Sequence, residues 1–427
     1  MSSTQLRSLE IATETNFCGL SSSYTSPNVT GLTFYAVDYL DLSQLLVDGE
    51  PLANDPSGMK GGSYSMPARP IYLSNATPVR GSLSFDFYLR GWESTDPGIV
   101  ALLKTRFNQT SSASVTTSTI STATTSTQAV TASAAINTAA GGVCMALHND
   151  VAIYGYVCAY SSGTSFTATP NIVSRGAATS DKINGCWTLA LPTAGLPATT
   201  STVAIKITGQ GWTQTLMGCS LTSLTMNSSS DSRGVRCTAT VDVAYVSFAT
   251  SGTPKVIAAD ATTGVLSQLA SPLGLGEVFA LTTGSFGSGA AATTSSAFPS
   301  ICVDEWSLSV EFSTAFSSCG SYMTGRSKSE TTSVTATLEL TLGDSSTFSV
   351  FKSQWVQQKA RTAILGFNGV DDNGDTIGGA IVFPAAVVSE FNDALDMSSD
   401  FVRTKVTLAA GPCPISTQPS FVLALRN

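Results

Sequence analysis

Apolar and polar residues alternate with a period of two in several segments of the chain, which is the pattern of a β-strand with one buried face. The clearest segments are residues 82–90, 236–245, 306–312 and 333–342. Their expected buried rows are Leu83, Phe85, Phe87 and Leu89, then Cys237, Ala239, Val241, Val243 and Tyr245, then Trp306, Leu308, Val310 and Phe312, and finally Val334, Ala336, Leu338, Leu340 and Leu342. Ser, Thr and acidic residues fill the positions between, so we expect antiparallel strands with one solvated face.

Two short segments have helical periodicity instead, and each follows one of these strands and a glycine. The first, residues 94–107, has Asp96 as a candidate cap, Pro97 in the first turn and one apolar face made of Ile99, Leu102, Leu103 and Phe107. The second, residues 344–358, has Asp344 or Ser345 as the cap and helical spacing of Phe348, Phe351 and Trp355. The same unit of strand, glycine and capped helix therefore occurs twice.

The match extends to both sides of this unit as a pattern rather than as identical letters. Residues 34–43 correspond in place to 303–312, and residues 212–248 resemble residues 378–411. We therefore expect two related β domains. The first covers residues 1–255, with an N-terminal arm and a Ser/Thr/Ala-rich insertion near 108–190, residues 256–297 form a linker, and the second domain covers residues 298–427.

Composition agrees with β structure and excludes several classes of protein. Of the 427 residues, 42% are hydrophobic and only 12% are charged, which disfavours helical bundles and coiled coils. The formal net charge of −8 disfavours stable binding to nucleic acid. No apolar run is long enough for a membrane helix, and no signal peptide is evident, so we expect synthesis and folding in a cytoplasm. Glycines and prolines at residues 49–70 indicate a long loop.

Candidate catalytic and metal-binding residues are few. Nine cysteines are scattered without a CxxC spacing, and most are expected to fill cores, with one or two disulfides as the alternative: Cys18, Cys144, Cys158, Cys186, Cys219, Cys237, Cys302, Cys319 and Cys413. The sequence around His148 contains no pattern of a Ser or Cys nucleophile, such as GxSxG. Residues 371–375 resemble an acidic calcium loop but lack its glycine and closing acid, so a hairpin turn is expected. We expect no enzyme, metal or cofactor site.

A large β protein with Ser/Thr-covered strands and few charges is typical of a subunit whose surface is covered by copies of itself, because long charged side chains would have to be desolvated at such contacts. Three specific kinds of protein are also compatible with these features and remain open. They are a self-assembling virion protein such as a capsid or decoration subunit, a cell-surface carbohydrate-binding β protein, and a β-rich hydrolase.

The order of these features resembles the tail tube proteins of long-tailed bacteriophages, in the class with two tube domains per chain. The resemblance rests on the long hairpins, the two helices after strands, residues 215–245 with their glycine-led hairpin and residues 378–391. It implies two β-sandwich or barrel-like domains, each with one packed helix. It also implies a trimeric ring with pseudo-sixfold symmetry, stacked into a tube of the virion tail, and partners at the tail tip or initiator, the tape measure and the tail terminator.

The resemblance gives the negative charge a role, since DNA ejected through a tube must not adhere to its wall. Polar residues on the alternating strands are the candidates for facing the lumen: Ser84, Asp86, Glu311, Thr337 and Glu339. Alternation defines two faces of a strand but not which one is inside. Solvent or a neighbouring domain is the other possible environment for these residues. The Ser/Thr/Ala-rich insertion is expected to decorate the outside or to bridge successive rings.

Overall fold

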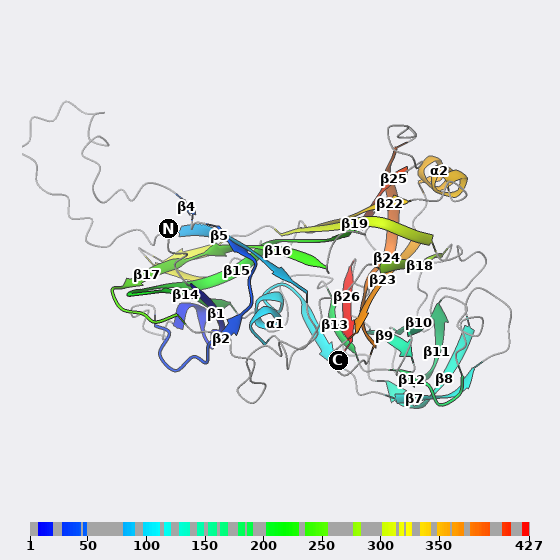
Figure 1. Cartoon of the computed structure of the whole chain (residues 1–427), viewed down its shortest axis with the longest axis horizontal. Coiled ribbons are helices and arrows are strands. Elements are labelled where there is room, and N and C mark those ends of the chain that lie inside the picture. Colours follow the sequence, from blue (N-terminus) through cyan, green and yellow to red (C-terminus); the bar gives the residue numbers. More distant parts are fainter. Residues whose placement is uncertain are drawn as a thin grey trace, which may run out of the picture.

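The computed structural model describes residues 7–19, 28–43, 46–48, 80–89, 97–111, 115–120, 128–136, 143–148, 153–159, 163–169, 178–183, 186–190, 202–229, 235–254, 276–282, 301–312, 316–319, 322–326, 334–342, 348–358, 361–370, 376–392, 404–410 and 421–426. Most of these residues lie in antiparallel strands, so the protein is mainly β, as the alternating pattern predicts (Figure 1). Two α-helices lie within these segments, α1 (Pro97–Leu103) and α2 (Phe348–Gln357).

One sheet of 18 strands contains most of the described strands. Its strands from the N-terminal part of the chain are β1 (Ser8–Thr13), β2 (Tyr35–Val37), β3 (Asp41–Leu42), β4 (Leu46–Asp48), β5 (Arg80–Tyr88), β14 (Val203–Gly209), β15 (Trp212–Ser229), β16 (Arg236–Val243) and β17 (Tyr245–Ala249). Its strands from the C-terminal part are β18 (Gly276–Thr282), β19 (Ile301–Phe312), β22 (Val334–Leu342), β23 (Arg361–Val370), β24 (Thr376–Phe391), β25 (Thr404–Ala410) and β26 (Val422–Arg426). The strands β6 (Asn108–Ser111) and β13 (Cys186–Ala190) complete it.

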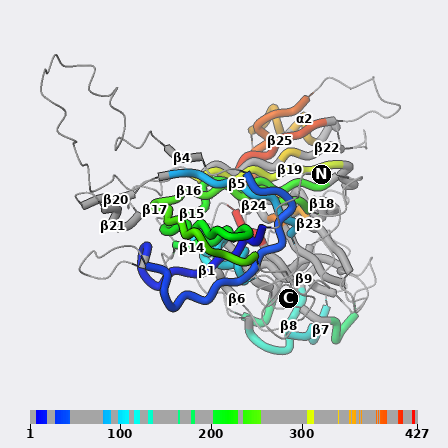
Figure 2. The backbone as a smooth tube through the Cα atoms, turned by 60° about the vertical axis from the view of Figure 1, so that its left-hand side comes forward, coloured from blue at the N-terminus to red at the C-terminus, as the bar shows by residue number. Residues whose placement is uncertain are grey.

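A closed barrel lies between β6 and β13 in the chain and at one end of the molecule in Figure 1, and its strands β7 and β8 lie at the bottom of the view in Figure 2. Its strands are β7 (Val115–Ile120), β8 (Gln128–Ile136), β9 (Val143–His148), β10 (Ile153–Ala159), β11 (Gly163–Thr169) and β12 (Lys182–Ile183). Because β6 and β13 pair with each other, the barrel is connected to the sheet through two adjacent strands. The Ser/Thr/Ala-rich insertion therefore contains a barrel. A separate two-stranded sheet joins β20 (Phe316–Cys319) to β21 (Tyr322–Arg326).

The strands of the large sheet pair in the same order twice along the chain. First, β3 pairs with β5, β5 with β16 and β16 with β15. Then β19 pairs with β22, β22 with β25 and β25 with β24. The flanking order β1, β14, β15, β17 likewise corresponds to β18, β23, β24, β26. We call β1–β5, α1 and β14–β17 the first repeat, and β18, β19, β22, α2 and β23–β26 the second repeat.

A bulge occupies the same place in both repeats. Thr222 lies in the bulge of β15 and donates a hydrogen bond to the carbonyl of Thr240 at 2.9 Å. Ser389 lies in the bulge of β24 and donates one to the carbonyl of Thr407 at 3.2 Å. Because a bulge is a specific local feature, its recurrence with the same side-chain bond fixes which residues of the two repeats are equivalent.

A residue shortly after each helix contacts the same place in its repeat. Arg106 Nε, after α1, donates to the carbonyl of Leu221 at 2.6 Å, and Leu221 directly precedes the first bulge. Gln358 Nε2, after α2, donates to the carbonyl of Val388 at 3.2 Å, and Val388 directly precedes the second bulge. The two helices are therefore attached to equivalent points of the long strands.

The long strand β15 takes part in two parts of the sheet. Residues 212–219 pair with β14 and residues 213–217 with β17, whereas residues 220–227 pair with β16 on one side and residues 223–229 with β19 on the other. The strand changes partners near Gly218, which has a φ of 66°, a left-handed conformation that glycine adopts without steric cost. A Cβ atom there would lie 2.6 Å from the Sγ atom of Cys18. The pairing of β15 with β19 joins the two repeats.

The buried rows predicted for β5, β16 and β19 are confirmed, because each of their apolar residues is buried. The side chains of the row predicted for β22 lie outside the described residues. A single hydrophobic cluster contains core residues of both repeats. Phe107, after α1, contacts the rings of Phe312 and Phe421 with centroid distances of 5.6 and 6.0 Å, so the first repeat packs directly onto the second.

Both predicted helices are present, although they differ in burial. In α1, Pro97 occupies the first position and residues 98–103 are buried. In α2, Phe351 is fully buried but Trp355 is 39% exposed. The expected caps Asp96, Asp344 and Ser345 lie outside the described residues, as do the expected loop at 49–70 and residues 283–297. The strand β18 lies within residues 256–297, so that range contributes a strand to the sheet.

Candidate functional site: the polar face of the large sheet

The five polar candidates from the sequence lie on three strands of the large sheet. Ser84 and Asp86 belong to β5, Glu311 belongs to β19, and Thr337 and Glu339 belong to β22. Two other strands, β16 and β15, separate β5 from β19. At the ordinary spacing of about 4.8 Å between strands, the candidates spread over roughly 19 Å of sheet. They form part of an extended surface and not a compact site.

Strand register places all five candidates on one face of the sheet. Ser84 lies opposite Thr240, which lies opposite Ser223, which in turn lies opposite Glu311. Since directly opposite residues in antiparallel strands share a face, Ser84 and Glu311 are on the same side. On β22, Thr337 lies opposite Ser309, and Glu339 lies opposite Ser307. These β19 residues alternate with the buried row of that strand, so they share the face of Glu311.

We call this surface the polar face: the side of the strands β3, β4, β5, β16, β15, β19, β22, β25 and β24 that carries these residues. Along β16, exposed or half-buried residues alternate strictly with buried ones, and β5 behaves in the same way. The buried residues belong to the hydrophobic cluster on the opposite side. The polar face is therefore continuous across both repeats, with a packed core behind it.

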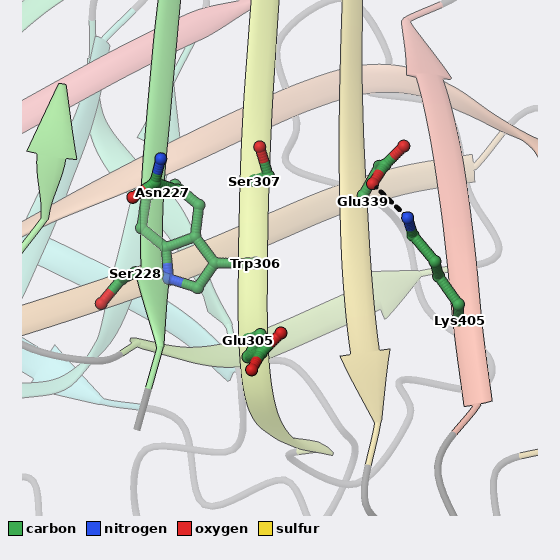
Figure 3. Close-up of a pocket in the computed structure, with 7 residues that line it drawn as sticks. All are labelled: Asn227, Ser228, Glu305, Trp306, Ser307, Glu339 and Lys405. Carbon is green, nitrogen blue, oxygen red and sulfur yellow. Dashed lines mark ion pairs between the residues drawn. The ribbon is translucent and has the colours of Figure 1, made fainter. Parts of the chain in front are cut away.

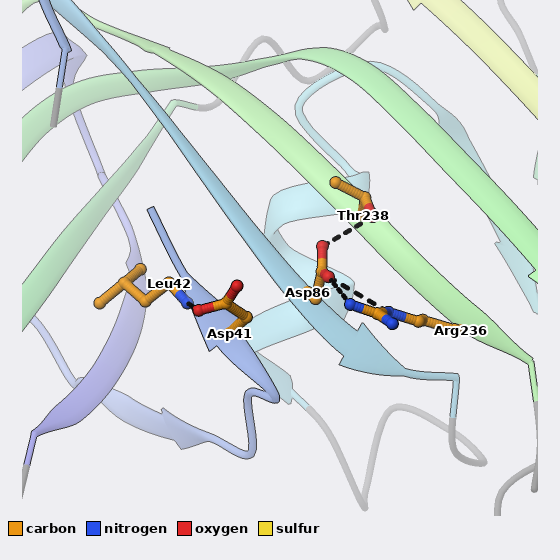
Figure 4. A network of polar contacts seen from close by, with 5 residues as sticks. All are labelled: Asp41, Leu42, Asp86, Arg236 and Thr238. Carbon is orange, nitrogen blue, oxygen red and sulfur yellow. Dashed lines mark hydrogen bonds and ion pairs between the residues drawn. The ribbon is translucent and has the colours of Figure 1, made fainter. Parts of the chain in front are cut away.

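Asp86 is at the centre of a hydrogen-bond network on the first repeat (Figure 4). Its Oδ2 atom accepts a hydrogen bond from Arg236 Nε at 3.1 Å and forms an ion pair with Arg236 Nη2, and its Oδ1 atom accepts from Thr238 at 2.7 Å. The hydrogen bond and charge of Asp86 raise the pKa of Arg236. Next to this network, the hydroxyl oxygens of Ser84 and Thr240 lie 3.2 Å apart.

The second repeat has an ion pair on the same face, between Lys405 and Glu339 at 2.6 Å. Both residues line a hollow of about 430 Å³ over the neighbouring strands β15, β19, β22 and β25, together with Asn227, Ser228, Glu305, Trp306 and Ser307 (Figure 3). Glu339 and Lys405 remain about half exposed, so the pair adds little to stability. No histidine or cysteine is among the residues that line the hollow.

Carboxylates predominate on the polar face. Register places on it Asp41, Asp48, Asp86, Asp242, Glu305, Glu311, Glu339 and Glu390. The basic residues that register places there are Arg80, Arg236 and Lys405. Hydroxyl groups of Ser and Thr occupy most of the positions between. A surface of this kind offers few cations to phosphate groups, and its excess of carboxylates repels a polyanion.

A buried carboxylate, Glu14, holds the start of the first repeat together. Glu14 accepts hydrogen bonds from the backbone N–H of Cys18 at 3.0 Å, from the N–H of Gly218 at 2.9 Å and from the hydroxyl of Thr202. Burial raises the pKa of Glu14, an effect that these three hydrogen bonds oppose. The network ties the 3₁₀ turn Phe17–Gly19 to the bend of β15.

The three cysteines whose side chains are described, Cys18, Cys219 and Cys237, are buried and free. Burial raises the pKa of each thiol, so none is suited to act as a nucleophile near neutral pH. This agrees with the expectation that most cysteines fill the core. The other six cysteine side chains lie outside the described residues.

The remaining candidates from the sequence give no site in the part of the chain that the structure describes. His148 ends β9, opposite Ile153 and Lys182, and its side chain is not among those described. The acidic residues 371–375 are outside the described segments, while Val370 and Thr376 on either side pair with each other. No group of three or more His, Cys, Asp or Glu residues among the described ones is placed to hold a metal ion.

No described helix has the length and apolar character needed to cross a membrane. The chain matches no model of a known protein family, and the comparison with curated proteins gives no match either.

The sequence did not indicate several other residues of the polar face. Arg236, Lys405 and Glu390 were not expected there, nor were the hydroxyl rows of β15 and β16. The signal in β16 was present, because Thr238, Thr240 and Asp242 alternate with its predicted buried row. What the sequence lacks is the register, which depends on pairings between residues that are far apart along the chain.

Proposed function

We propose that this chain is a structural subunit of the tail tube of a long-tailed bacteriophage. In this proposal, each repeat is a tube-type β domain with one packed helix, and three chains form a ring with pseudo-sixfold symmetry. Rings stack into the tail of the virion, and the genome passes through the lumen during ejection. Assembly takes place in the host cytoplasm with tail tip or initiator, tape measure and tail terminator proteins as partners.

The observation that carries this proposal is the continuous polar face, which crosses both repeats and contains all five residues that the sequence suggests for a lumen. A sheet with a packed core on one side and a hydroxyl and carboxylate surface on the other suits a wall along which DNA slides. Its excess of acids keeps phosphate contacts few, and such contacts would slow ejection. The repeated order of strand pairing supports the proposal of two related domains per chain.

Electron microscopy of the purified protein tests whether it forms a tube. We expect rings or tubes of uniform diameter with a hollow centre as the protein concentration is raised. Monomers that persist over a wide range of salt and protein concentration would contradict the proposal. Solid filaments or closed shells would instead favour another self-assembling virion protein.

Charge on the polar face gives a second test, specific to the lumen. The double variant Ser84→Lys, Glu311→Lys adds cations to the polar face, so tubes made from it should retain short duplex DNA that wild-type tubes release. The single variant Ser84→Lys has a matched control in Ser247→Lys, which makes the same substitution at an exposed serine of β17 outside the polar face. Equal retention of DNA by both variants would contradict a luminal position for this face.

A further inference from the structure

The hollow beside the ion pair of Lys405 and Glu339 contains a second carboxylate. Lys405 Nζ lies 2.6 Å from Glu339 Oε2, so this ammonium group already has an acid beside it. Glu305, which lines the same hollow, is exposed and has no hydrogen-bond or ion-pair partner among the residues that the structure describes. The described lining therefore holds two carboxylates and only one ammonium group.

Strand register places Glu305 and Lys405 symmetrically about Glu339. Glu339 on β22 lies directly opposite Ser307 on β19 and directly opposite Thr407 on β25. Glu305 and Lys405 each lie two residues before these opposite residues, on the two sides of β22 (Figure 3). Diagonal neighbours on antiparallel strands are within reach of long side chains. A cation between Glu339 and Glu305 would therefore mirror the ammonium group of Lys405.

The other described groups of the lining are uncharged. Asn227, Ser228 and Ser307 carry amide and hydroxyl groups, and Trp306 supplies apolar surface. Carboxylate, amide and hydroxyl oxygens all accept hydrogen bonds from an ammonium group. The volume of about 430 Å³ lies within the range of small-ligand sites, about 300–1,000 Å³. The lining therefore suits a cation that has several N–H donors and some apolar surface.

Other classes of ligand fit these groups less well. Two carboxylates repel an anion, and Lys405 is the one basic residue of the described lining. A calcium ion takes about six to eight oxygen ligands, whereas no group of three or more His, Cys, Asp or Glu residues among the described ones is placed to hold a metal ion. An alkylammonium group needs fewer acceptors, and Lys405 already binds Glu339 in this way.

We infer that the hollow binds a linear aliphatic polyamine, with one primary ammonium group between Glu305 and Glu339 and the adjoining methylene groups beside Trp306. Each bound molecule reduces the excess of carboxylates on the polar face and so weakens the repulsion of a polyanion by that face. The site goes beyond the proposed function and does not depend on it, because all of its named residues belong to one chain.

Isothermal titration calorimetry with spermidine tests this site in the full-length chain. At about 0.15 M salt, which screens exposed charges more than about 8 Å apart, we expect saturable binding of one spermidine per chain. Glu305→Gln removes the negative charge and keeps the size of the side chain, so it should weaken binding about tenfold.

Glu311→Gln is the matched control, because it makes the same change on the same strand and face. Glu311 lies outside the described lining of the hollow and about 20 Å along β19 from Glu305. Its loss should therefore change the affinity for spermidine by less than about twofold at this salt concentration. Circular dichroism of both variants checks that they remain folded.

Lys405 gives a prediction of the opposite sign. Its ammonium group competes with the ligand for Glu339, so Lys405→Met should bind spermidine more tightly than the wild type does. Met retains an unbranched apolar side chain and lacks the charge. Weaker binding by Lys405→Met would overturn the inference, because Lys405 would then not compete with the ligand.

Three further cations separate hydrogen bonding from charge. 1,6-Diaminohexane and hexamethonium have the same chain between two positive charges, but hexamethonium has no N–H donor. The diamine should therefore bind at least about tenfold more tightly than hexamethonium. Magnesium chloride supplies a divalent ion without an alkyl chain, and at equal concentration it should not displace spermidine.

The outcomes separate this inference from the proposed function. Weaker binding by Glu305→Gln with unchanged binding by Glu311→Gln would support the site. An absence of saturable binding would overturn it, and so would equal losses in the two variants, which would indicate attraction to the acidic face as a whole. Equal affinity for the diamine and hexamethonium, or displacement of spermidine by magnesium, would overturn it as well. Tubes that bind no polyamine would leave the proposed function standing, whereas persistent monomers that bind it would support the site and contradict the tube.

Discussion

The first and second repeats share their strand order but differ in how completely the chain itself covers them. In the first repeat, α1 is buried almost throughout and the long strand β15 has partners on both edges. In the second repeat, α2 has one fully buried residue among those described, Phe351, and residues 386–391 of β24 pair with β25. The same order of strands therefore accommodates helices that differ in how deeply they are packed.

The largest expected difference between the repeats lies in their helices. Leu102 of α1 is fully buried, so Leu102→Ala should lower the free energy of unfolding by about 2–5 kcal/mol. Val356 of α2 is 69% exposed, so Val356→Ala should change it by less than about 0.5 kcal/mol in the monomer. Urea unfolding of both variants measures these values. Equal losses would show that α2 is as deeply packed as α1.

The bend of β15 is expected to give the next largest effect. Gly218→Ala places a Cβ atom 2.6 Å from Cys18 Sγ and 2.8 Å from Ala244 Cβ, in a backbone conformation that is unfavourable for alanine. Together, the crowding and the backbone strain should cost about 2–4 kcal/mol. Gly211 also has a positive φ but has open space around it, so Gly211→Ala should cost only about 1 kcal/mol. Similar losses in the two variants would contradict close packing at the bend.

The residues after the helices test the equivalence of the two repeats. Arg106→Leu removes a donor to the carbonyl of Leu221 in the core, and the unpaired carbonyl should cost about 1–3 kcal/mol. Gln358→Leu removes the equivalent bond to Val388, but Gln358 is exposed and water can replace it, so we expect a cost below about 1 kcal/mol. Thermal unfolding of both variants measures the difference. A larger loss for Gln358→Leu would contradict the structure of the second repeat.

The smallest expected effect is a dependence of stability on pH that arises in the first repeat. Burial raises the folded-state pKa of Glu14 above its unfolded value near 4.3, so its contribution to stability is fully present below that unfolded value and is lost as pH rises through the folded-state pKa. Glu14→Gln has no such group. The unfolding free energy of Glu14→Gln minus that of the wild type should therefore increase with rising pH. A difference that stays constant or decreases would contradict this assignment.

Much of this fold could be predicted from the alternation of apolar and polar residues, because that pattern depends only on residues that are close together in the chain. The buried rows of β5, β16 and β19 follow from side chains that point to opposite faces in turn, and Pro97 marks the start of α1 through its fixed φ. The repeated unit of strand and helix was visible for the same reason. These features depend on neighbours within a few residues.

The rest depends on contacts between distant segments, which periodicity does not encode. The strands β7, β8 and β11 of the barrel consist mostly of small Ser, Thr and Ala residues, whose alternation carries little hydrophobic contrast. Glu14 is bonded to Thr202 and Gly218, which are far from it in the chain, so nothing near Glu14 indicates its burial. The five candidate residues of the polar face likewise share a face only through the register of the strands β5, β16, β15, β19 and β22.

A three-dimensional reconstruction by electron cryo-microscopy of the assembled protein tests most directly whether the polar face lines a tube. If the polar face lines a tube, the reconstruction will show a hollow tube in which Ser84, Asp86, Glu311, Thr337 and Glu339 point toward the lumen. A tube with these residues on its outer surface, or an assembly without a lumen, would contradict it.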